Sequence, residues 1–369
     1  MTSGASPTSK IVAVALPLLL ASTIAQAGHK LEREDRKKVD VSGQTVIVIK
    51  NTRGKTIVVG EPGSKQVNIV ANKWVGAKDA ESAQRIMDAL VFEVEVSDDK
   101  IVVISKLPEA SQKDSSIWSV VKGGKLKAYI DLTVEVPYEF SVETYTTSGD
   151  VQVTNLAGEA RISATSGDLL LRDIGGGSVI ELTSGNIHAV DVSGDLRIAA
   201  SSGDTEIKRV KGLVAVQATS GNVYAYEVGG DAMVNLVTGD FKIKGCLGDV
   251  NFSTAAGNAE IADVLGGVNA TSSSGDLDVV IVPVGEKEFY LNTATGNIAL
   301  HFVTVTDYGF LLNVNTCTGS IKGDLDIELE KITRRTLKGV VGSGKSRVII
   351  ETASGDVSIL ERTEKNEKK

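Results

Sequence analysis

The chain of 369 residues contains few of the residue types that cross-link small domains or build catalytic centres. Its only cysteines are Cys246 and Cys317, which the repeat described below would separate by several coils. A disulfide requires Cα atoms within about 7 Å, so none is expected. The three histidines, His29, His188 and His301, are dispersed along the sequence. Neither a histidine metal cluster nor a serine triad is therefore evident.

Long apolar runs are also missing after residue 27, where no segment approaches the roughly 20 residues of a membrane helix. We expect no integral membrane segment in the mature chain. A shorter apolar run, residues 11–25, follows Lys10 and ends in Ala25-Gln26-Ala27, a pattern typical of signal-peptide cleavage. Residues 1–27 are therefore predicted to be a signal peptide, with an uncleaved anchor as the alternative. The protein is expected to be exported to the periplasm, the cell surface or the medium.

Basic residues are outnumbered by acidic ones, and the net charge is −8. Removal of Lys10 with the signal peptide takes it to −9. An acidic chain is a poor partner for nucleic acid or anionic lipid.

What the sequence has in abundance is glycine at a fixed spacing. Fifteen glycines recur every nine residues from Gly149 to Gly275 without a gap. Alternate members carry Ser-Gly-Asp or Ser-Gly-Asn, as at residues 148–150, 166–168 and 184–186, so the full repeat is 18 residues long. A strict repeat of this kind is typical of a solenoid.

Small or apolar residues stand two and four positions after the glycines, as Leu169 and Leu171 do. Such alternation predicts strands with one buried face. A further apolar column, seven residues after every second glycine, comprises Leu156, Ile174, Val192, Val210, Val228, Cys246 and Val264. Glycine with Asp, Asn or Ser supplies the positive φ values that tight corners need. We therefore predict an all-β fold, a parallel β-solenoid (β-helix) with about 18 residues per coil.

Four segments follow from these patterns. They are a signal peptide (1–27), an N-terminal β region (28–143) with one short capping helix (77–91), the regular repeats (144–282), and C-terminal irregular coils with a charged tail (283–369). Residues 107–125 are predicted to form a surface loop. The last segment is expected to continue the coils with insertions, because Thr295-Gly296-Asn297 and Ser354-Gly355-Asp356 repeat the corner signature.

Two motifs resemble known ligand-binding patterns, but their sequence context argues against binding. Residues 339–346 match the phosphate-loop pattern, but a strand rather than a helix is predicted to follow them, so no nucleotide is expected. The corner column of Asp150, Asp168, Asn186, Asp204 and its successors resembles a calcium-binding β-roll. Each corner offers too few oxygen ligands for calcium, which takes six to eight. No catalytic, cofactor-binding or metal-binding residue is predicted.

The outward positions of the strands carry the strongest candidate for a partner-binding surface. Tyr224 and Tyr226 are expected to point outward together, with His188 and Lys242 in the same column as Tyr224. Exposed aromatic side chains flanked by cations are typical of protein or sugar recognition. The alternatives are cross-strand packing alone, or a site on the opposite face around Asn235, Asn251, Ser253 and Asn269.

The signal segment, residues 51–59, Val136-Pro137, the serial Ser-Gly-Asp corners and the closing residues 342–357 resemble the bacterial putative-adhesin domain-of-unknown-function family. The resemblance covers nearly the whole mature chain. It implies an exported β-solenoid at the cell envelope and brings no catalytic residues. We therefore expect a non-enzymatic interaction or structural scaffold, with an envelope protein or a polysaccharide as partner. A carbohydrate-active β-helix enzyme and a purely structural, self-assembling module remain the alternatives.

Overall fold

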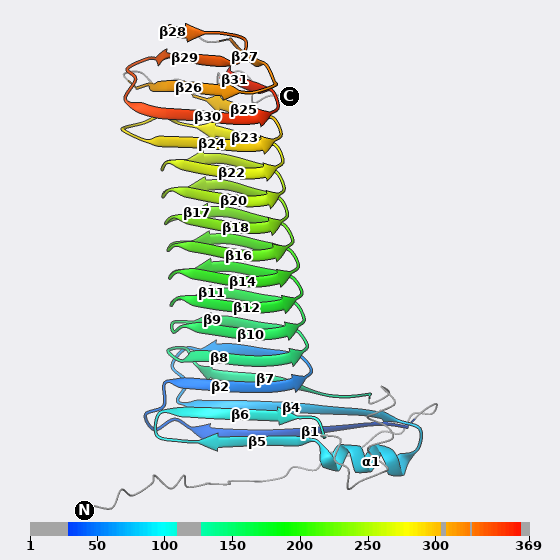
Figure 1. Ribbon diagram of the computed structural model, residues 1–369. Coiled ribbons are helices and arrows are strands. Elements are labelled where there is room, and N and C mark those ends of the chain that lie inside the picture. The colour runs from blue at the N-terminus through cyan, green and yellow to red at the C-terminus, as the bar shows by residue number, and fades with distance from the viewer. Residues whose placement is uncertain (1–28, 109–126, 304–307, 325–326, 363–369) are drawn as a thin grey trace, which may run out of the picture. The chain divides into compact units, whose positions relative to one another are not determined.

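The computed structural model describes residues 29–108, 127–303, 308–324 and 327–362 (Figure 1). The predicted signal peptide and most of the predicted surface loop and charged tail lie outside these residues. The chain forms two compact units, Met1–Gly177 (unit 1) and Ser178–Lys369 (unit 2). In each unit the strands form two mostly parallel sheets, here called sheet A and sheet B.

Unit 1 contains the helix and the first strands. Their bounds are β1 (His29–Asp40), β2 (Val46–Arg53), β3 (Thr56–Glu61), β4 (Gln66–Ala77), α1 (Ala80–Ala89), β5 (Val91–Val96), β6 (Lys100–Lys106), β7 (Lys127–Pro137), β8 (Ser141–Ser148), β9 (Val151–Leu156), β10 (Ala160–Ser166) and β11 (Leu169–Ile174). Sheet A has the order β1-β4-β7-β3-β9-β11, and sheet B has the order β10-β8-β2-β6-β5.

Unit 2 begins with regular coils. Its bounds are β12 (Ser178–Ser184), β13 (Ile187–Val192), β14 (Leu196–Ser202), β15 (Thr205–Val210), β16 (Val214–Ser220), β17 (Val223–Val228), β18 (Ala232–Thr238), β19 (Phe241–Cys246), β20 (Val250–Ala256), β21 (Ala259–Val264), β22 (Val268–Ser274), β23 (Leu277–Ile281), β24 (Glu288–Thr295), β25 (Ile298–Phe302), β26 (Phe310–Thr316), β27 (Ile321–Asp324), β28 (Glu328–Ile332), β29 (Thr336–Val341), β30 (Ser346–Ser354) and β31 (Val357–Glu361). Sheet A runs β13-β15-β17-β19-β21-β23-β25-β31-β27. Sheet B runs β12-β14-β16-β18-β20-β22-β24-β30-β26-β29-β28.

The predicted fold class is confirmed by the pairing of the strands. Thr205 of β15 pairs with Val223 of β17, and Val214 of β16 pairs with Ala232 of β18, each 18 residues away. The predicted core columns are buried, including Val192, Val210 and Val228. Equal repeats in register place like residues above like, so each apolar column forms a continuous stripe of the core.

The corners use two different backbone solutions, and the sequence predicted only one of them. At the Ser-Gly-Asp corner Gly203 has φ +121°, and a Cβ built on it would lie 1.8 Å from the carbonyl oxygen of Gly185 on the preceding coil. At the other corner the positive φ falls on non-glycine residues, such as Asp191 (58°), Arg209 (55°) and Glu227 (57°). The expectation that glycine with Asp, Asn or Ser supplies the positive φ values holds for Asp191 but not for Arg209 and Glu227.

The outer coils of both units depart from sequence order. In unit 1, β2 lies between β6 and β8 in sheet B, so residues 46–59 form the coil next to residues 141–154. In unit 2, β30 lies between β24 and β26. The Ser354-Gly355-Asp356 coil therefore stacks directly on the Thr295-Gly296-Asn297 coil.

The helix α1 is shorter than the predicted segment 77–91. Asp79 caps its first turn by accepting a hydrogen bond from the N–H of Ser82 (2.7 Å). Ala83, Ile86 and Met87 are buried, and the helix contacts β1 and β4. The terminal strands of the two sheets of unit 1 are β1 and β5. The helix packs beside β1 and β4 of sheet A and does not itself take the place of a terminal strand.

Candidate functional site

The outward face of sheet A in unit 2 presents two parallel columns of side chains. Within each column, neighbours on successive coils pair directly, as Glu206, Tyr224 and Lys242 do. Tyr226 lies in the second column between Lys208 and Lys244. The structure thus places both tyrosines on one face, half-buried and pointing away from the core. His188 and Lys242 lie in the column of Tyr224.

Several side chains of this face form ion pairs, either with a residue on the next coil or with one two positions along the same strand. His188 Nδ1 lies 3.0 Å from Glu206 Oε2, and Glu206 also pairs with Lys208. The Lys208 ammonium lies 5.8 Å from the centroid of the Tyr226 ring. The hydrogen bond from Lys208 is the main cause that lowers the pKa of Glu206. His188 and Tyr226 therefore belong to a cross-strand network that positions this part of the face.

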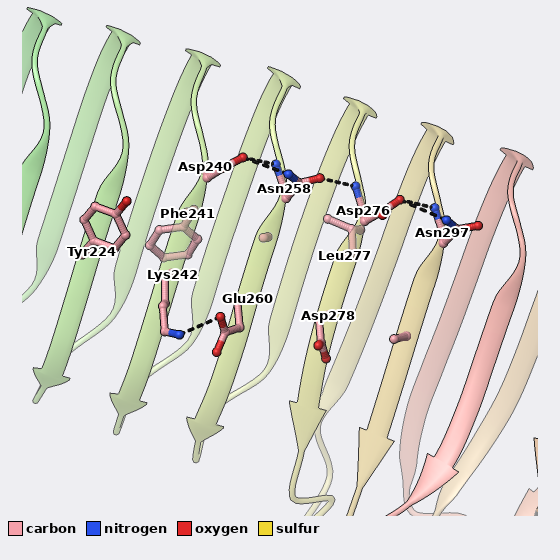
Figure 2. A pocket seen from close by; sticks show the side chains of 12 residues that line it. Tyr224, Asp240, Phe241, Lys242, Asn258, Glu260, Asp276, Leu277, Asp278 and Asn297 are labelled. Carbon is pink, nitrogen blue, oxygen red and sulfur yellow. Dashed lines mark hydrogen bonds and ion pairs between the residues drawn. The ribbon is translucent and has the colours of Figure 1, made fainter.

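A groove of about 430 Å³ opens beside this network, over strands β17 to β25 (Figure 2). It is lined by four consecutive members of the first column, with Tyr224 at one end followed by Lys242, Glu260 and Asp278, and then by Ala299. One side is formed by the corner residues Asp240, Asn258, Asp276 and Asn297. All of these residues belong to unit 2.

The corner residues form a hydrogen-bonded ladder that Figure 2 shows along the ends of the strands. Asp240 Oδ1 accepts from the backbone N–H of Asn258 (2.8 Å), and Asn258 Oδ1 accepts from that of Asp276 (2.8 Å). Asp276 Oδ1 in turn accepts from the N–H of Asn297 (2.7 Å). The corner column predicted from sequence therefore fixes the backbone of the next coil, which is the physical reason for Asp or Asn at this position.

The floor holds a short ion pair. Lys242 Nζ lies 2.7 Å from Glu260 Oε2, and this hydrogen bond raises the pKa of Lys242. Asp278 lies 3.4 Å from His301 Nε2 on the next coil. Within the described part of the chain, no cluster of three or more His, Cys, Asp or Glu side chains could hold a metal ion.

Sequence reasoning named Tyr224 and Lys242 but missed the hollow beside them. Ala299 was missed because three residues are inserted after Val282, so that Leu277 pairs with Ile298 rather than with a residue 18 positions later. The signal was present in the returning corner Thr295-Gly296-Asn297, which places residue 299 in the first outward column. The opposite-face alternative is also polar, and Ser253 donates to Asn235 Oδ1 there (2.6 Å).

The other sequence motifs have structural roles. Residues 339–346 run from β29 through a turn into β30, and the Ser346 hydroxyl donates to the carbonyl oxygen of Gly285 (2.9 Å). Cys246 and Cys317 are both free. Burial raises the pKa of the Cys246 thiol to about 11, which makes it a core residue of low reactivity. None of the helices among the described residues is long and apolar enough to cross a membrane.

Stacked parallel coils that bury their apolar columns and carry a groove on the outer face of one sheet define a β-solenoid. Residues 96–239 and 180–360 each match the sequence model of the Toastrack DUF4097 family. Together these matches span more than half of the chain, and the chain belongs to this family.

Several solved structures are similar to this chain. A "putative adhesin" from Parabacteroides distasonis ATCC 8503 has 10% identity and a TM-score of 0.32, covering 89% of this chain and 97% of its own. A "putative cell adhesion protein" from Clostridium sporogenes ATCC 15579 has 10% identity and a TM-score of 0.21, covering 90% and 100%. A "putative lipid binding protein" from Parabacteroides distasonis ATCC 8503 has 11% identity and a TM-score of 0.25, covering 89% and 97%. No curated protein matches the chain.

Proposed function

We propose that this protein is a non-enzymatic, exported binding scaffold of the cell envelope, and that the outward face of sheet A in unit 2 is its binding surface. The groove beside Tyr224 is the observation that carries this proposal. It is a concave site on a stacked sheet whose side chains are held in place by ion pairs and by the corner ladder. A surface fixed before the partner arrives loses little conformational entropy on binding.

Export is part of the same proposal. It is supported by Lys10, the apolar residues 11–25 and the Ala25-Gln26-Ala27 pattern. The mature chain would then meet its partner outside the cytoplasm, where an envelope protein or polysaccharide is available.

The test is co-sedimentation of the purified mature chain, residues 28–369, with isolated cell envelopes. We expect saturable binding that Ala299→Trp weakens, because the indole would fill the groove. The matched control is Ala215→Trp, which adds the same bulk at a half-buried outward position of sheet B. Absence of saturable binding, or equal loss with both variants, would contradict the proposal.

A second candidate, self-assembly, is favoured by one specific feature of unit 2. The strand β28 lies at the edge of sheet B, and all five of its residues are exposed, with Leu329 at 52% and Ile332 at 67%. Glu328, Glu330 and Lys331 of this strand are charged, but Leu329 and Ile332 expose apolar side chains at an unpaired strand edge, which is a template for pairing with another chain. Light scattering over a concentration series would detect such oligomers, and Leu329→Lys should abolish them.

A further inference from the structure

We propose that the groove over β17 to β25 binds a segment of a polyhydroxylated oligosaccharide that carries no acidic groups, with Tyr224 as its aromatic wall. This inference rests on the proposed function, because it names the class of ligand for the same surface.

The shape of the groove follows from the lengths of the side chains in the first column. Tyr224 and Lys242 are long, Glu260 and Asp278 are shorter, and Ala299 is the shortest. Because each lies one coil further along, the surface descends stepwise from the tyrosine ring to the alanine. The result is an elongated hollow that crosses several coils, which suits a chain of repeated units better than a single small molecule.

The tyrosine at the high end is available to a ligand. Tyr224 is half-buried, and its hydroxyl makes no hydrogen bond within the part of the chain that the structure describes. An aromatic side chain has an apolar face and a polar tip, so it can stack against a sugar ring and still contact a hydroxyl group. Figure 2 shows the Tyr224 ring at one end of the row that continues through Lys242 and Glu260 to Asp278.

The long side of the groove is rich in hydrogen-bond acceptors. Asp240 and Asp276 each use Oδ1 in the corner ladder, and no bond to their Oδ2 atoms is found among the described residues. Glu260 and Asp278 add two more carboxylates on the floor. The matching ligand must therefore offer many donors, as a chain of sugar hydroxyl groups does. Charged acceptors form the stronger hydrogen bonds with such donors.

The charge of the groove excludes acidic ligands. Four carboxylates line it, from Asp240, Glu260, Asp276 and Asp278, against the single ammonium of Lys242. That ammonium is already paired with Glu260 at 2.7 Å. A phosphate, a nucleic acid or a uronate chain would meet repulsion with no unpaired cation among the described lining residues to offset it, whereas an amino sugar would be attracted.

A protein partner fits the groove less well. The exposed large apolar side chains of the described residues include Met233, Leu247 and Leu265, and none of them lines the groove. Protein interfaces depend on buried aromatic and apolar anchors at their centre. Two aromatic residues line the groove, and Phe241 is buried in the core, so the half-buried ring of Tyr224 offers the aromatic surface for sugar stacking.

The experiment is isothermal titration of the mature chain with three defined probes, cellohexaose, the glucosamine hexamer of chitosan, and hexagalacturonate. We expect the glucosamine hexamer to bind at least as tightly as cellohexaose, and hexagalacturonate to show no binding. Tyr224→Ala should weaken binding of the glucosamine hexamer about tenfold, the effect of losing one stacking anchor. Ala299→Trp should abolish it, and Ala215→Trp should leave it unchanged. Circular dichroism would establish that each variant is folded.

Three results would overturn the inference. They are no heat of binding with either cellohexaose or the glucosamine hexamer, tightest binding of hexagalacturonate, or equal affinity of the wild type and Ala299→Trp for the glucosamine hexamer. Failure of the proposed function can be distinguished from failure of this inference by the envelope co-sedimentation experiment. Envelope binding that Ala299→Trp blocks, with no oligosaccharide binding, leaves the surface in place and makes its ligand another molecule. Loss of both kinds of binding removes the surface as well.

Discussion

Asn258→Asp is expected to destabilise the protein although it changes neither the shape nor the acceptor atom of the side chain. Asn258 stands between Asp240 and Asp276 in the corner ladder. The variant would place three carboxylates on successive coils, which are about 4.8 Å apart. It would also lose the hydrogen bond from Asn258 Nδ2 to Asp240 Oδ1 (3.1 Å).

The magnitude follows from Coulomb's law. Two like charges at about 4.8 Å in water repel by roughly 0.9 kcal/mol, and the introduced carboxylate would have two such neighbours. All three side chains are exposed, so the dielectric constant of water is appropriate. Together with the lost hydrogen bond, the expected loss of unfolding free energy is about 2 kcal/mol at low ionic strength.

The assay is urea unfolding followed by circular dichroism at low salt and at about 1 M salt, where the screening length falls to about 3 Å. Most of the loss should disappear at high salt. The matched control is Asp240→Asn, which keeps the acceptor and removes a charge, and should leave stability unchanged or slightly raised. A loss that is equal at both salt concentrations, or no loss at all, would refute the electrostatic explanation of the Asp and Asn alternation.

Three further outcomes are expected. Gly203→Val should cost at least about 2 kcal/mol, because its φ of +121° and the Gly185 carbonyl oxygen leave no room for a side chain; an unchanged urea midpoint would contradict this. Glu227→Gly should raise stability by about 0.5–1 kcal/mol, because Glu227 has φ +57° and Gly245 occupies the same corner position one coil later; a lower melting temperature would count against it. The pKa of Asp195 is lowered mainly by a hydrogen bond from the N–H of Leu213. Its contribution is therefore complete above the unfolded-state pKa of about 3.9 and is lost as the pH falls through the lower folded-state value. Asp195→Asn keeps the acceptor without titrating, so its stability should fall less steeply below about pH 4, as pH-dependent urea midpoints would show.

The regular coils could be predicted from sequence because one physical rule repeats in every coil. A buried position, an outward position and a corner recur at fixed spacing, so the register of β15 on β17 follows from the glycine spacing alone. The outward placement of Tyr224 and Tyr226 follows from the same alternation.

The strand β1 was not predicted from sequence. Its residues, His29–Asp40, are mostly charged and lack apolar alternation, because the strand lies at a sheet edge with most of its side chains exposed. It is a strand because β4 offers it twelve residues of antiparallel pairing. This long-range pairing leaves no local pattern in the sequence.

The coil order in unit 2 also depends on long-range contacts. The strand β30 pairs with β24 on one side and with β26 on the other, although β26 precedes it in the sequence. The groove depends on the same irregular region, since Ala299 follows the first insertion after the strict repeats. The side-chain lengths in the outward column could be read from the sequence. The groove could not be predicted without knowing that Ile298 pairs with Leu277, which places Ala299 at the end of this column.

The most direct test of the central claim, that sheet A of unit 2 is the binding surface, is hydroxyl-radical footprinting of the mature chain with and without a saturating envelope polysaccharide fraction. Tyr224 and Tyr226 report on that face, and Met233, which is 39% exposed on β18, reports on the outward face of sheet B. We predict that the fraction protects both tyrosines from oxidation and leaves Met233 unchanged. Protection of Met233 with unprotected tyrosines would contradict the claim and move the site to the face that carries Asn235 and Asn251.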